Sequence, residues 1–280
     1  MLRQCTNCGA AVEVDDAVLS ATCRFCDSPL VDGARAAEVV DGVVPFTVPK
    51  ARARDAIVRW LAGLWFVPTA LQRASRADEL GAVFVPAYAH EALCRSRWTA
   101  RIGLHWTRTE TYTTVENGKT VTKTRQVTET EWFPTSGTHA VVWHDHLVSA
   151  SQGLSEAESN ALEPFDLGQA VPFAPEVVAG VAAEQPTRTH AEVDAVAHDE
   201  LLGRARDAVA RLLPGDRSSG LSVQTDVDVQ GVRLVLLPVW IAAVTAGGHT
   251  VRVLVNGQTG EVVGQVPTDW GKVVVAVGAA

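Results

Sequence analysis

The chain has 280 residues, enough to bury a sizeable core, and this length favours one large domain or about two to three small ones. Hydrophobic residues make up 47% of the chain and charged residues 20%, which excludes a disordered protein. The formal net charge of −8 argues against sequence-independent nucleic-acid binding by the whole surface, and against an anionic membrane partner, because both need clustered Lys and Arg.

Targeting and membrane-spanning segments are not expected. The first residues lead directly into a cysteine motif and leave no room for the apolar part of a secretory signal. The longest apolar run, 234–246, has about 13 residues, whereas about 20 are needed to span a bilayer, and the run at 273–280 is shorter still. We therefore expect a cytoplasmic protein without a membrane span, whose cysteines are thiolates rather than disulfides.

The first element in the chain is a pair of C-x-x-C motifs separated by 14 residues. Each C-x-x-C turn presents two sulfurs on one side of a tight loop, and two such turns complete the tetrahedral shell of sulfurs that Zn²⁺ prefers. The spacing is close to that of zinc ribbons. The sequence therefore predicts a zinc ribbon over residues 1–32, with one structural Zn²⁺ per chain held by Cys5, Cys8, Cys23 and Cys26.

The residues around the cysteines fit this ribbon. Gly9 follows the first pair and suits a knuckle that needs a positive φ, while Asp27 follows the second pair and tolerates that conformation less well. Residues 11–14 and 17–21 have the pattern of short strands around a turn at 15–16. Two alternatives stay open: a rubredoxin-like iron site uses the same four sulfurs, and a redox-active C-x-x-C would need a βαβ setting that we do not find.

The charge of the ribbon favours a protein partner over DNA. Two basic residues stand against five acidic ones in 1–32, namely Arg3 and Arg24 against Glu13, Asp15, Asp16, Asp27 and Asp32. A ribbon that binds nucleic acid would need the opposite balance. The fifth cysteine, Cys94, lies in an apolar stretch and is predicted to be a buried core residue.

Two helices and two strands are predicted after a link at 31–38. Apolar residues spaced for one buried face predict a helix that ends before Pro68, with Ala53, Ile57, Trp60, Leu61 and Leu64 on that face. Thr69 is predicted to cap a second helix that runs to about Leu80 and closes at Gly81. Strands are expected at 83–88 and 98–105.

A long polar hairpin is predicted at 107–132. The Thr-rich sequence alternates strictly around Asn117-Gly118, which predicts a type I′ turn. Pairing outward from this turn places Glu116 opposite Lys119 and Glu110 opposite Arg125, so that opposite charges face each other. Both faces are largely polar, so the hairpin is not core. It is either a solvated extension or an arm that docks on a partner.

The second half of the chain is predicted to add helices and a strand-rich end. Thr138–Val148 is predicted to be a strand in which His144 and His146 share a face, which makes a second metal site conceivable, while His139 has the wrong parity. Short helices are expected after the Ser155–Glu158 capping box and after Pro175, and a long one at 191–213. Strands are expected from 221 onward, with turns at 230–231, 247–248 and 256–257.

The two halves of the body echo each other. An apolar run broken by proline and followed by an aromatic residue occurs at 83–88 and again at 234–240, which favours a duplicated helix-plus-meander unit. Proline within a strand indicates an edge or a bulge. The predicted fold class is α+β: a zinc ribbon, a first α+β unit over 43–150 and a second over 151–280. We expect residues 43–280 to keep their own core without the ribbon.

Several motifs resemble a family of uncharacterised bacterial zinc-ribbon proteins, often labelled as transcription-factor-type zinc ribbons or primosomal replication-restart helicases. These motifs are Val44-Pro45-Phe46, Trp65-Phe66-Val67-Pro68, Leu162–Leu167, Leu237–Trp240 and Val255-Asn256-Gly257-Gln258-Thr259-Gly260-Glu261-Val262. The resemblance covers nearly the whole chain, and the last motif is also similar to the strand–turn–strand end of a PepSY-type module. The family's typical aromatic around 243–245 is absent here, and His144 and His146 are not family features.

The resemblance implies a zinc-containing fold but no reaction. The helicase label fails because the chain has no G-x-x-x-x-G-K-[ST] phosphate loop, and no other catalytic motif is found. We therefore expect a non-enzymatic adaptor that mediates protein–protein interaction. The alternative is a nucleic-acid-associated factor that uses the ribbon or a basic stripe formed by Lys119, Lys123 and Arg125.

Overall fold

The computed structural model has an α+β fold with a large sheet and few helices, in agreement with the predicted class. The residues that it describes lie in the following ranges: 2–5, 7–15, 18–31, 40–73, 78–116, 118–270 and 272. Parts of several predictions lie outside these ranges: the turn residue Asp16, the strand residue Ala17, the link at 32–38, residues 74–77 of the second predicted helix, the turn residue Asn117 and the apolar run at 273–280.

The chain divides into two compact units that are each assembled from separate stretches of sequence. The first unit comprises Met1–His90, Asp145–Ala197 and Gly231–Ala280, and the second comprises Glu91–His144 and His198–Gln230. Both units take residues from the predicted ranges 43–150 and 151–280, because long strands and one long helix pass from one unit into the other. The two units thus have different boundaries from the two α+β units predicted at 43–150 and 151–280. The duplication of a helix-plus-meander unit stays a prediction.

The first unit is built on a sheet with the strand order β11-β10-β9-β6-β8-β3-β4, to which β5 adds by parallel pairing with β9. Within the described residues, the nine strands of this sheet are β3 (Val18–Thr22), β4 (Pro29–Val31), β5 (Gly42–Val43), β6 (Asp78–Glu116), β7 (Lys119–Ser149), β8 (Ala182–Glu184), β9 (Arg217–Ala246), β10 (His249–Asn256) and β11 (Val262–Gly264). Strand β7 pairs with β6. A separate pair is formed by β1 (Leu2–Gln4) and β2 (Ala11–Glu13).

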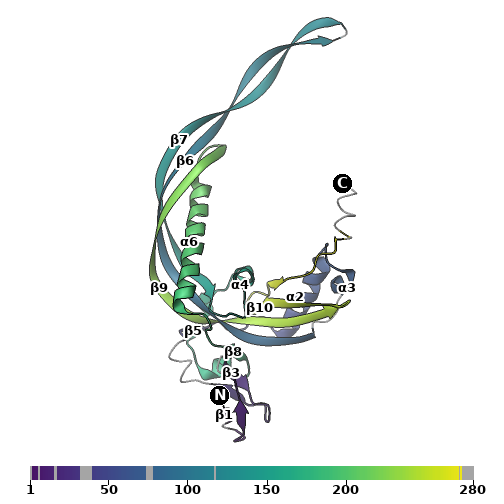
Figure 1. Cartoon of the computed structure of the whole chain (residues 1–280), viewed down its shortest axis with the longest axis vertical. Helices are drawn as coiled ribbons and strands as arrows, with labels where there is room; N and C mark the ends of the chain where they lie inside the picture. The colour runs from purple at the N-terminus through teal and green to yellow at the C-terminus, as the bar shows by residue number, and fades with distance from the viewer. Residues whose placement is uncertain are drawn as a thin grey trace. The chain divides into compact units, whose positions relative to one another are not determined.

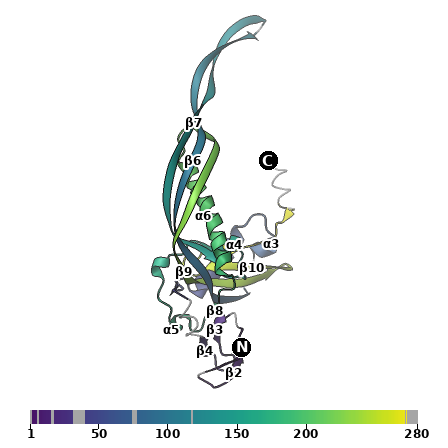
Figure 2. The same ribbon diagram turned by 60° about the vertical axis from the view of Figure 1, so that its left-hand side comes forward.

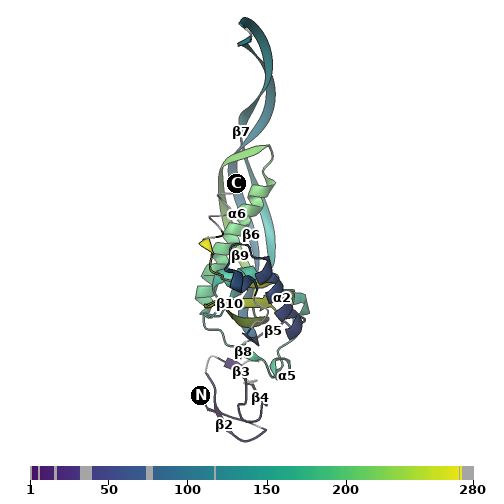
Figure 3. The same cartoon turned by 90° about the vertical axis from the view of Figure 1, so that its right-hand side faces the viewer.

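The ribbon shares this sheet with the body. Strand β3 lies between β4 and β8, as can be followed in Figure 3, and Ser20 is paired with Ala183. Leu19 is fully buried in a cluster that also contains Val43 and Phe84. The ribbon therefore packs against residues 43–280, and the expectation that these residues keep their own core without it stays a prediction.

Helix α2 (Lys50–Gly63) covers one part of this sheet through the predicted face. Ala53, Ile57 and Leu61 are buried together with residues of β9 and β10. The second predicted helix is much shorter than expected: α3 (Thr69–Gln72) begins after Pro68, and Leu80 and Gly81 belong to β6. Thr69 is the first helical residue rather than the cap, and the long-range pairing of β6 outweighs the local helical pattern near Leu80.

The proline-containing strands lie inside the sheet, so of the two settings expected for them, an edge or a bulge, the edge is not what the structure shows. Pro86 is in β6 and Pro238 is in β9, and each of these strands has a neighbour on both sides. Proline is tolerated in β9 because pairing with β10 ends at Val239, one residue after Pro238. The carbonyl of Pro238 still accepts a hydrogen bond from Gly257 N (2.8 Å).

The remaining helices agree with their predictions. Helix α4 (Glu156–Leu162) has the Ser155–Glu158 capping box, α5 (Pro175–Val178) begins at its proline, and α6 (His190–Leu212) is long. A 3₁₀ turn, η1 (Leu167–Gln169), follows α4. A turn does occur at 247–248, but the turn expected at 230–231 does not, because β9 continues through it.

In the second unit, β6 continues between β9 and β7 (Lys119–Ser149), and part of α6 covers one face (Figures 1 and 2). On that face, Ala92 and Cys94 of β6 pack against Leu201 and Ala205 of α6. Asp216, just before β9, donates its backbone N–H to Gly103 O at 3.0 Å. Beyond Gly103, β6 and β7 run on as a two-stranded hairpin (Figure 1).

Side-chain contacts between β6 and β7 agree with the predicted register. Arg125 donates to Glu110 across the hairpin at 2.8 Å, as expected from pairing outward from the turn. The same register extends far beyond the predicted hairpin: Thr130 bonds His105 (2.9 Å), and His144 lies 3.3 Å from Glu91. Glu116 is paired with Lys123 rather than with the predicted Lys119.

Candidate metal centre

The two C-x-x-C motifs form matching knuckles. In each, the residue after the second cysteine donates its backbone N–H to the carbonyl of the first cysteine: Gly9 to Cys5 at 2.8 Å and Asp27 to Cys23 at 2.9 Å. Both residues have a positive φ, 74° for Gly9 and 55° for Asp27, as predicted for the first and disfavoured for the second. Each knuckle turns its two thiols toward the other.

The four sulfurs converge on one point. Cys5 Sγ lies 3.6 Å from Cys26 Sγ, Cys8 Sγ lies 3.8 Å from Cys23 Sγ, and the four sulfurs all lie within 4.8 Å of one another. A tetrahedral shell with metal–sulfur bonds of about 2.3 Å needs sulfur–sulfur separations of about 3.8 Å. The four predicted ligands are therefore brought together and could hold one metal ion.

The thiols of Cys8 and Cys26 have pKa values shifted in opposite directions. Hydrogen bonds from the side chain and then the backbone of Ser28 lower the pKa of Cys26 to about 6. The backbone hydrogen bond from Ala10 acts to lower the pKa of Cys8, but hydrogen bonding to Cys26 and burial outweigh it and raise this pKa to about 12. One sulfur thus carries the charge while its neighbour keeps a proton, and a bound cation would favour the thiolate form of all four.

The other chemically interesting residues of the sequence do not join this cluster. Cys94 is fully buried, as predicted, and burial raises the pKa of its thiol, which makes it unreactive. In the basic stripe, Lys123 is paired with Glu116 and Arg125 with Glu110. Lys119 is exposed.

The predicted pair His144 and His146 does not share a face. Asp145 has a φ of 54°, which places a bulge between them, so that His144 is exposed while His146 is 2% exposed. Among the described residues, no group of three or more His, Cys, Asp or Glu ligands other than the four cysteines lies close enough to hold a metal. His139, His144 and His146 therefore form no second metal site there.

A buried histidine cluster was not foreseen from the sequence. His90, at the end of the first unit's part of β6, is 1% exposed and lies 3.1 Å from Asp194 of α6, which also bonds His190 at 2.8 Å. The ring of His90 lies 6.4 Å from that of His146. The i, i+4 spacing of His190 and Asp194 is visible in the sequence, but the approach of His90 depends on how β6 and α6 pack.

Asp194→Asn should lower the melting temperature, and the loss should shrink in acid. Burial acts to raise the pKa of Asp194, but hydrogen bonds from His90 and His190 outweigh it and lower the pKa. A carboxylate with a lowered pKa stabilises the fold above its unfolded pKa of about 3.9 and loses that effect as pH falls through its folded pKa. Melting curves of both proteins between pH 7 and pH 3 should converge at the acidic end. A constant difference would contradict this role.

The comparisons with known proteins give one distant relative. The chain is 26% identical over 240 residues to an uncharacterized protein, YdjG, from Bacillus subtilis (strain 168); the match covers 82% of this chain and 64% of YdjG. The chain thus spans less than two thirds of the length of this relative. No family model matches, and no solved structure matches. Within the described residues, no helix is long and apolar enough to cross a membrane.

Proposed function

We propose that this protein is a non-enzymatic zinc-ribbon adaptor, in which one structural Zn²⁺ fixes the ribbon and the β6–β7 hairpin docks on a protein partner. The resemblance to bacterial zinc-ribbon proteins supports this function. Four cysteines would fill the tetrahedral shell of the ion and leave no position for a substrate or an activated water. Zinc is favoured over iron because a closed set of four thiolates between short strands is the usual structural zinc site.

The exposure of the hairpin is the observation that carries the docking role. From Leu104 to Glu131, no described side chain is buried or packed against a core cluster, so this length of β6 and β7 contributes little to the core. A stretch of about 12 residues per strand would extend about 40 Å at about 3.3 Å per residue. Such an extension offers a long surface to a partner at little cost to the fold.

A protein partner is favoured over a nucleic acid. The predicted basic stripe is largely neutralised, since Lys123 and Arg125 are paired with Glu116 and Glu110, and Arg108 with Glu129. Phosphate backbones are bound by cations that are free to replace counterions. The ribbon is acidic as well, which adds to the same preference.

Deleting Thr109–Thr128 and closing the strands with a two-residue turn should leave the fold intact and abolish partner binding. Only cross-strand pairs within the hairpin are lost, each worth about 0.2–1 kcal/mol, and no core contact is removed. We expect the melting temperature to change by no more than about 3 °C. The partner is to be identified by cross-linking and co-purification with the tagged full-length chain, and then tested against the deletion.

A matched control keeps the hairpin but changes its chemistry. Exchanging Glu110 and Arg125 (Glu110→Arg with Arg125→Glu) preserves the ion pair and should preserve the partner. If the deletion retains the same partner, the hairpin is not the docking element. A drop of 10 °C or more would instead mean that the hairpin stabilises the body.

A further inference from the structure

The two faces of the β6–β7 hairpin differ in charge. One face carries the ion pairs and all four carboxylates of the hairpin itself; they belong to Glu110, Glu116, Glu129 and Glu131. Residues of the other face alternate with these along each strand. The contact of His105 with Thr130 shows which residues of the two strands lie opposite each other on this second face. Between Arg95 and Thr113 of β6, and between Thr120 and Ala140 of β7, this second face has no carboxylate.

Hydroxyl groups and arginines line the carboxylate-free face. Its exposed threonines are Thr99, Thr107, Thr109, Thr111 and Thr113 on β6, and Thr120, Thr122, Thr124 and Thr128 on β7. Nearer the base of the hairpin, Arg95, Arg97 and Arg101 lie on this face of β6 together with Thr99, and all three arginines are exposed. The intervening residues Ser96 and Ala100 are buried on the opposite face. We call the exposed set the Arg/Thr face.

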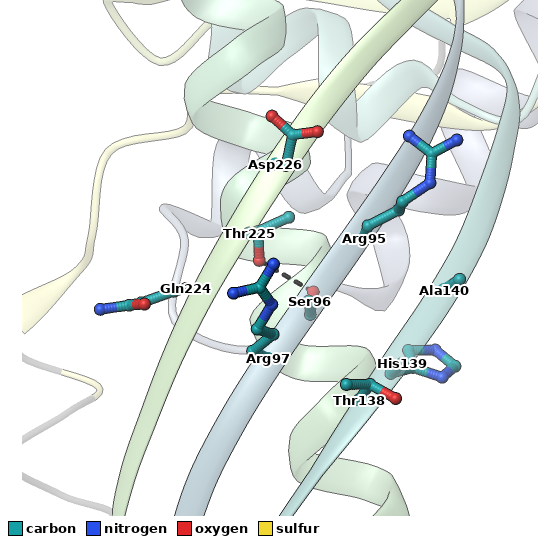
Figure 4. Close-up of a pocket in the computed structure, with 9 residues that line it drawn as sticks. All are labelled: Arg95, Ser96, Arg97, Thr138, His139, Ala140, Gln224, Thr225 and Asp226. Atoms are coloured by element: carbon teal, nitrogen blue, oxygen red, sulfur yellow. Dashed lines mark hydrogen bonds between the residues drawn. The ribbon is translucent and has the colours of Figure 1, made fainter.

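The three arginines have different partners. Arg95 lies 3.6 Å from Asp228 of β9, and Arg101 lies 6.0 Å from the centre of the Trp132 ring. Arg97 makes no ion pair or hydrogen bond with any residue that the structure describes. Figure 4 shows the guanidinium groups of Arg95 and Arg97 projecting from β6, with the side chains of neighbouring strands on either side.

Arg97 lies between two grooves. One, of about 720 Å³, extends toward Arg95 and Asp226, and the other, of about 430 Å³, extends toward Thr99. Both are lined by Arg97 together with Thr138 and Gln224. The second groove also contains the hydroxyls of Ser136 and Ser222. A guanidinium flanked by hydroxyl and amide donors is a setting that favours a carboxylate.

Within the proposed docking role of the hairpin, we propose that the Arg/Thr face is the contact surface and that it binds an acidic segment of a protein partner. The inference rests on that proposed function. Arg97 and Arg101 are four residues apart on β6, a separation of about 13 Å at about 3.3 Å per residue, which matches carboxylates four residues apart on an extended segment. Carboxylates of β9, Asp226 and Asp228, lie at the Arg95 end, so the attraction is centred on Arg97 and Arg101.

The charge of the Arg/Thr face favours an acidic peptide over a nucleic acid. Two cations with little local compensation, Arg97 and Arg101, fit a segment with two or three carboxylates. They do not supply the row of free cations that a phosphate backbone requires. Threonine side chains extend the surface toward the tip without adding charge, so they offer hydroxyl and methyl contacts to whatever lies along the strands.

The test uses a fluorescein-labelled 12-residue peptide with glutamate at every second position, measured by fluorescence anisotropy with the full-length chain. Binding should weaken at least about tenfold between 50 mM and 500 mM salt, because exposed charges are screened over about 4 Å at the higher salt. Arg97→Glu with Arg101→Glu should weaken it at least about fivefold. The control Lys119→Glu with Arg108→Glu also reverses two positive charges, but on the opposite face of the hairpin. It should change the peptide's dissociation constant by no more than about twofold.

Three outcomes overturn the inference. These are the absence of peptide binding, equal losses in the two double variants, and tighter binding of an oligo-dT of 12 nucleotides than of the peptide. The proposed function is judged separately, by whether deletion of Thr109–Thr128 loses the cross-linked partner. If the deletion loses the partner while Arg97→Glu with Arg101→Glu retains it, the hairpin docks but not through this face.

Discussion

Cys23→Ser should abolish metal binding and also destabilise the part of the first unit that packs against the ribbon. Cys23 is fully buried and directly follows β3, so a metal ion held by the four cysteines would fix the end of this strand. Strand β3 is paired with β8, and Ser20 Oγ donates to Val178 O at 3.1 Å. When the centre is lost, β3 should detach from β8 and expose Leu19.

We expect a large loss of stability in both the ribbon and the body that packs against it. Structural zinc contributes about 10–16 kcal/mol of apparent binding free energy in small zinc modules, so the ribbon itself should unfold. Loss of a buried leucine from a core costs about 2–5 kcal/mol, and exposure of Leu19 should lower the free energy of unfolding of the body by an amount of this order. Elemental analysis and thermal melting of the full chain, with and without a chelator, measure the two effects.

Two controls separate metal loss from packing loss. Cys94→Ser changes a buried cysteine outside the cluster and should retain one zinc per chain. Leu19→Ala should retain the zinc but lower the melting temperature. A chain that begins at Asp41 and melts at the same temperature as the full protein would contradict the supporting role of the ribbon. Iron instead of zinc in the intact chain would contradict the proposed metal.

Local chemistry explains which features the sequence could predict. The ribbon depends on two short C-x-x-C turns, and the hairpin on the alternating Thr-rich sequence on either side of its predicted turn, so neighbouring residues determine both. The register then follows from the hairpin, because each further pair is forced by the one before it. Contacts therefore match the predicted pairing as far as Glu91 and His144, well beyond the Thr-rich stretch.

The predictions that failed depend on long-range contacts or on one backbone torsion. The positive φ of Asp145 shifts the parity of β7, so that His146 faces the core beside His90 rather than sharing a face with His144. Gln230-Gly231 has the composition of a turn, yet β9 continues through it beside β6. The pairing of β3 with β8 joins residues more than 150 positions apart, and no local pattern in either strand indicates it.

Asn256→Ala should cause a loss of stability comparable to that of a core truncation, although it removes only an amide. Asn256 is fully buried at the end of β10. Its side-chain nitrogen donates to Leu162 O (2.7 Å) and Pro164 O (2.9 Å), and its oxygen accepts from the backbone of Gln258 (2.8 Å) and Thr259 (3.0 Å). One side chain thus joins the end of α4 to the turn after β10.

Alanine would leave these backbone groups without a partner. A buried donor or acceptor left unsatisfied costs about 1–3 kcal/mol, and water can reach some of the four groups. We therefore expect a loss of about 3 kcal/mol or more, or roughly 10 °C in the melting temperature of a chain of this size. Denaturant unfolding followed by circular dichroism measures the change.

Gln258→Ala is the matched control, because it removes a neighbouring amide that also bonds backbone. Gln258 accepts from Asp166 N (2.7 Å) and donates to Asp166 O (3.1 Å), but it is only half-buried, so water can replace these bonds. Its loss should cost about 1 kcal/mol. If the two variants unfold at the same denaturant concentration, Asn256 does not join α4 to the turn, because burial is what distinguishes the two amides.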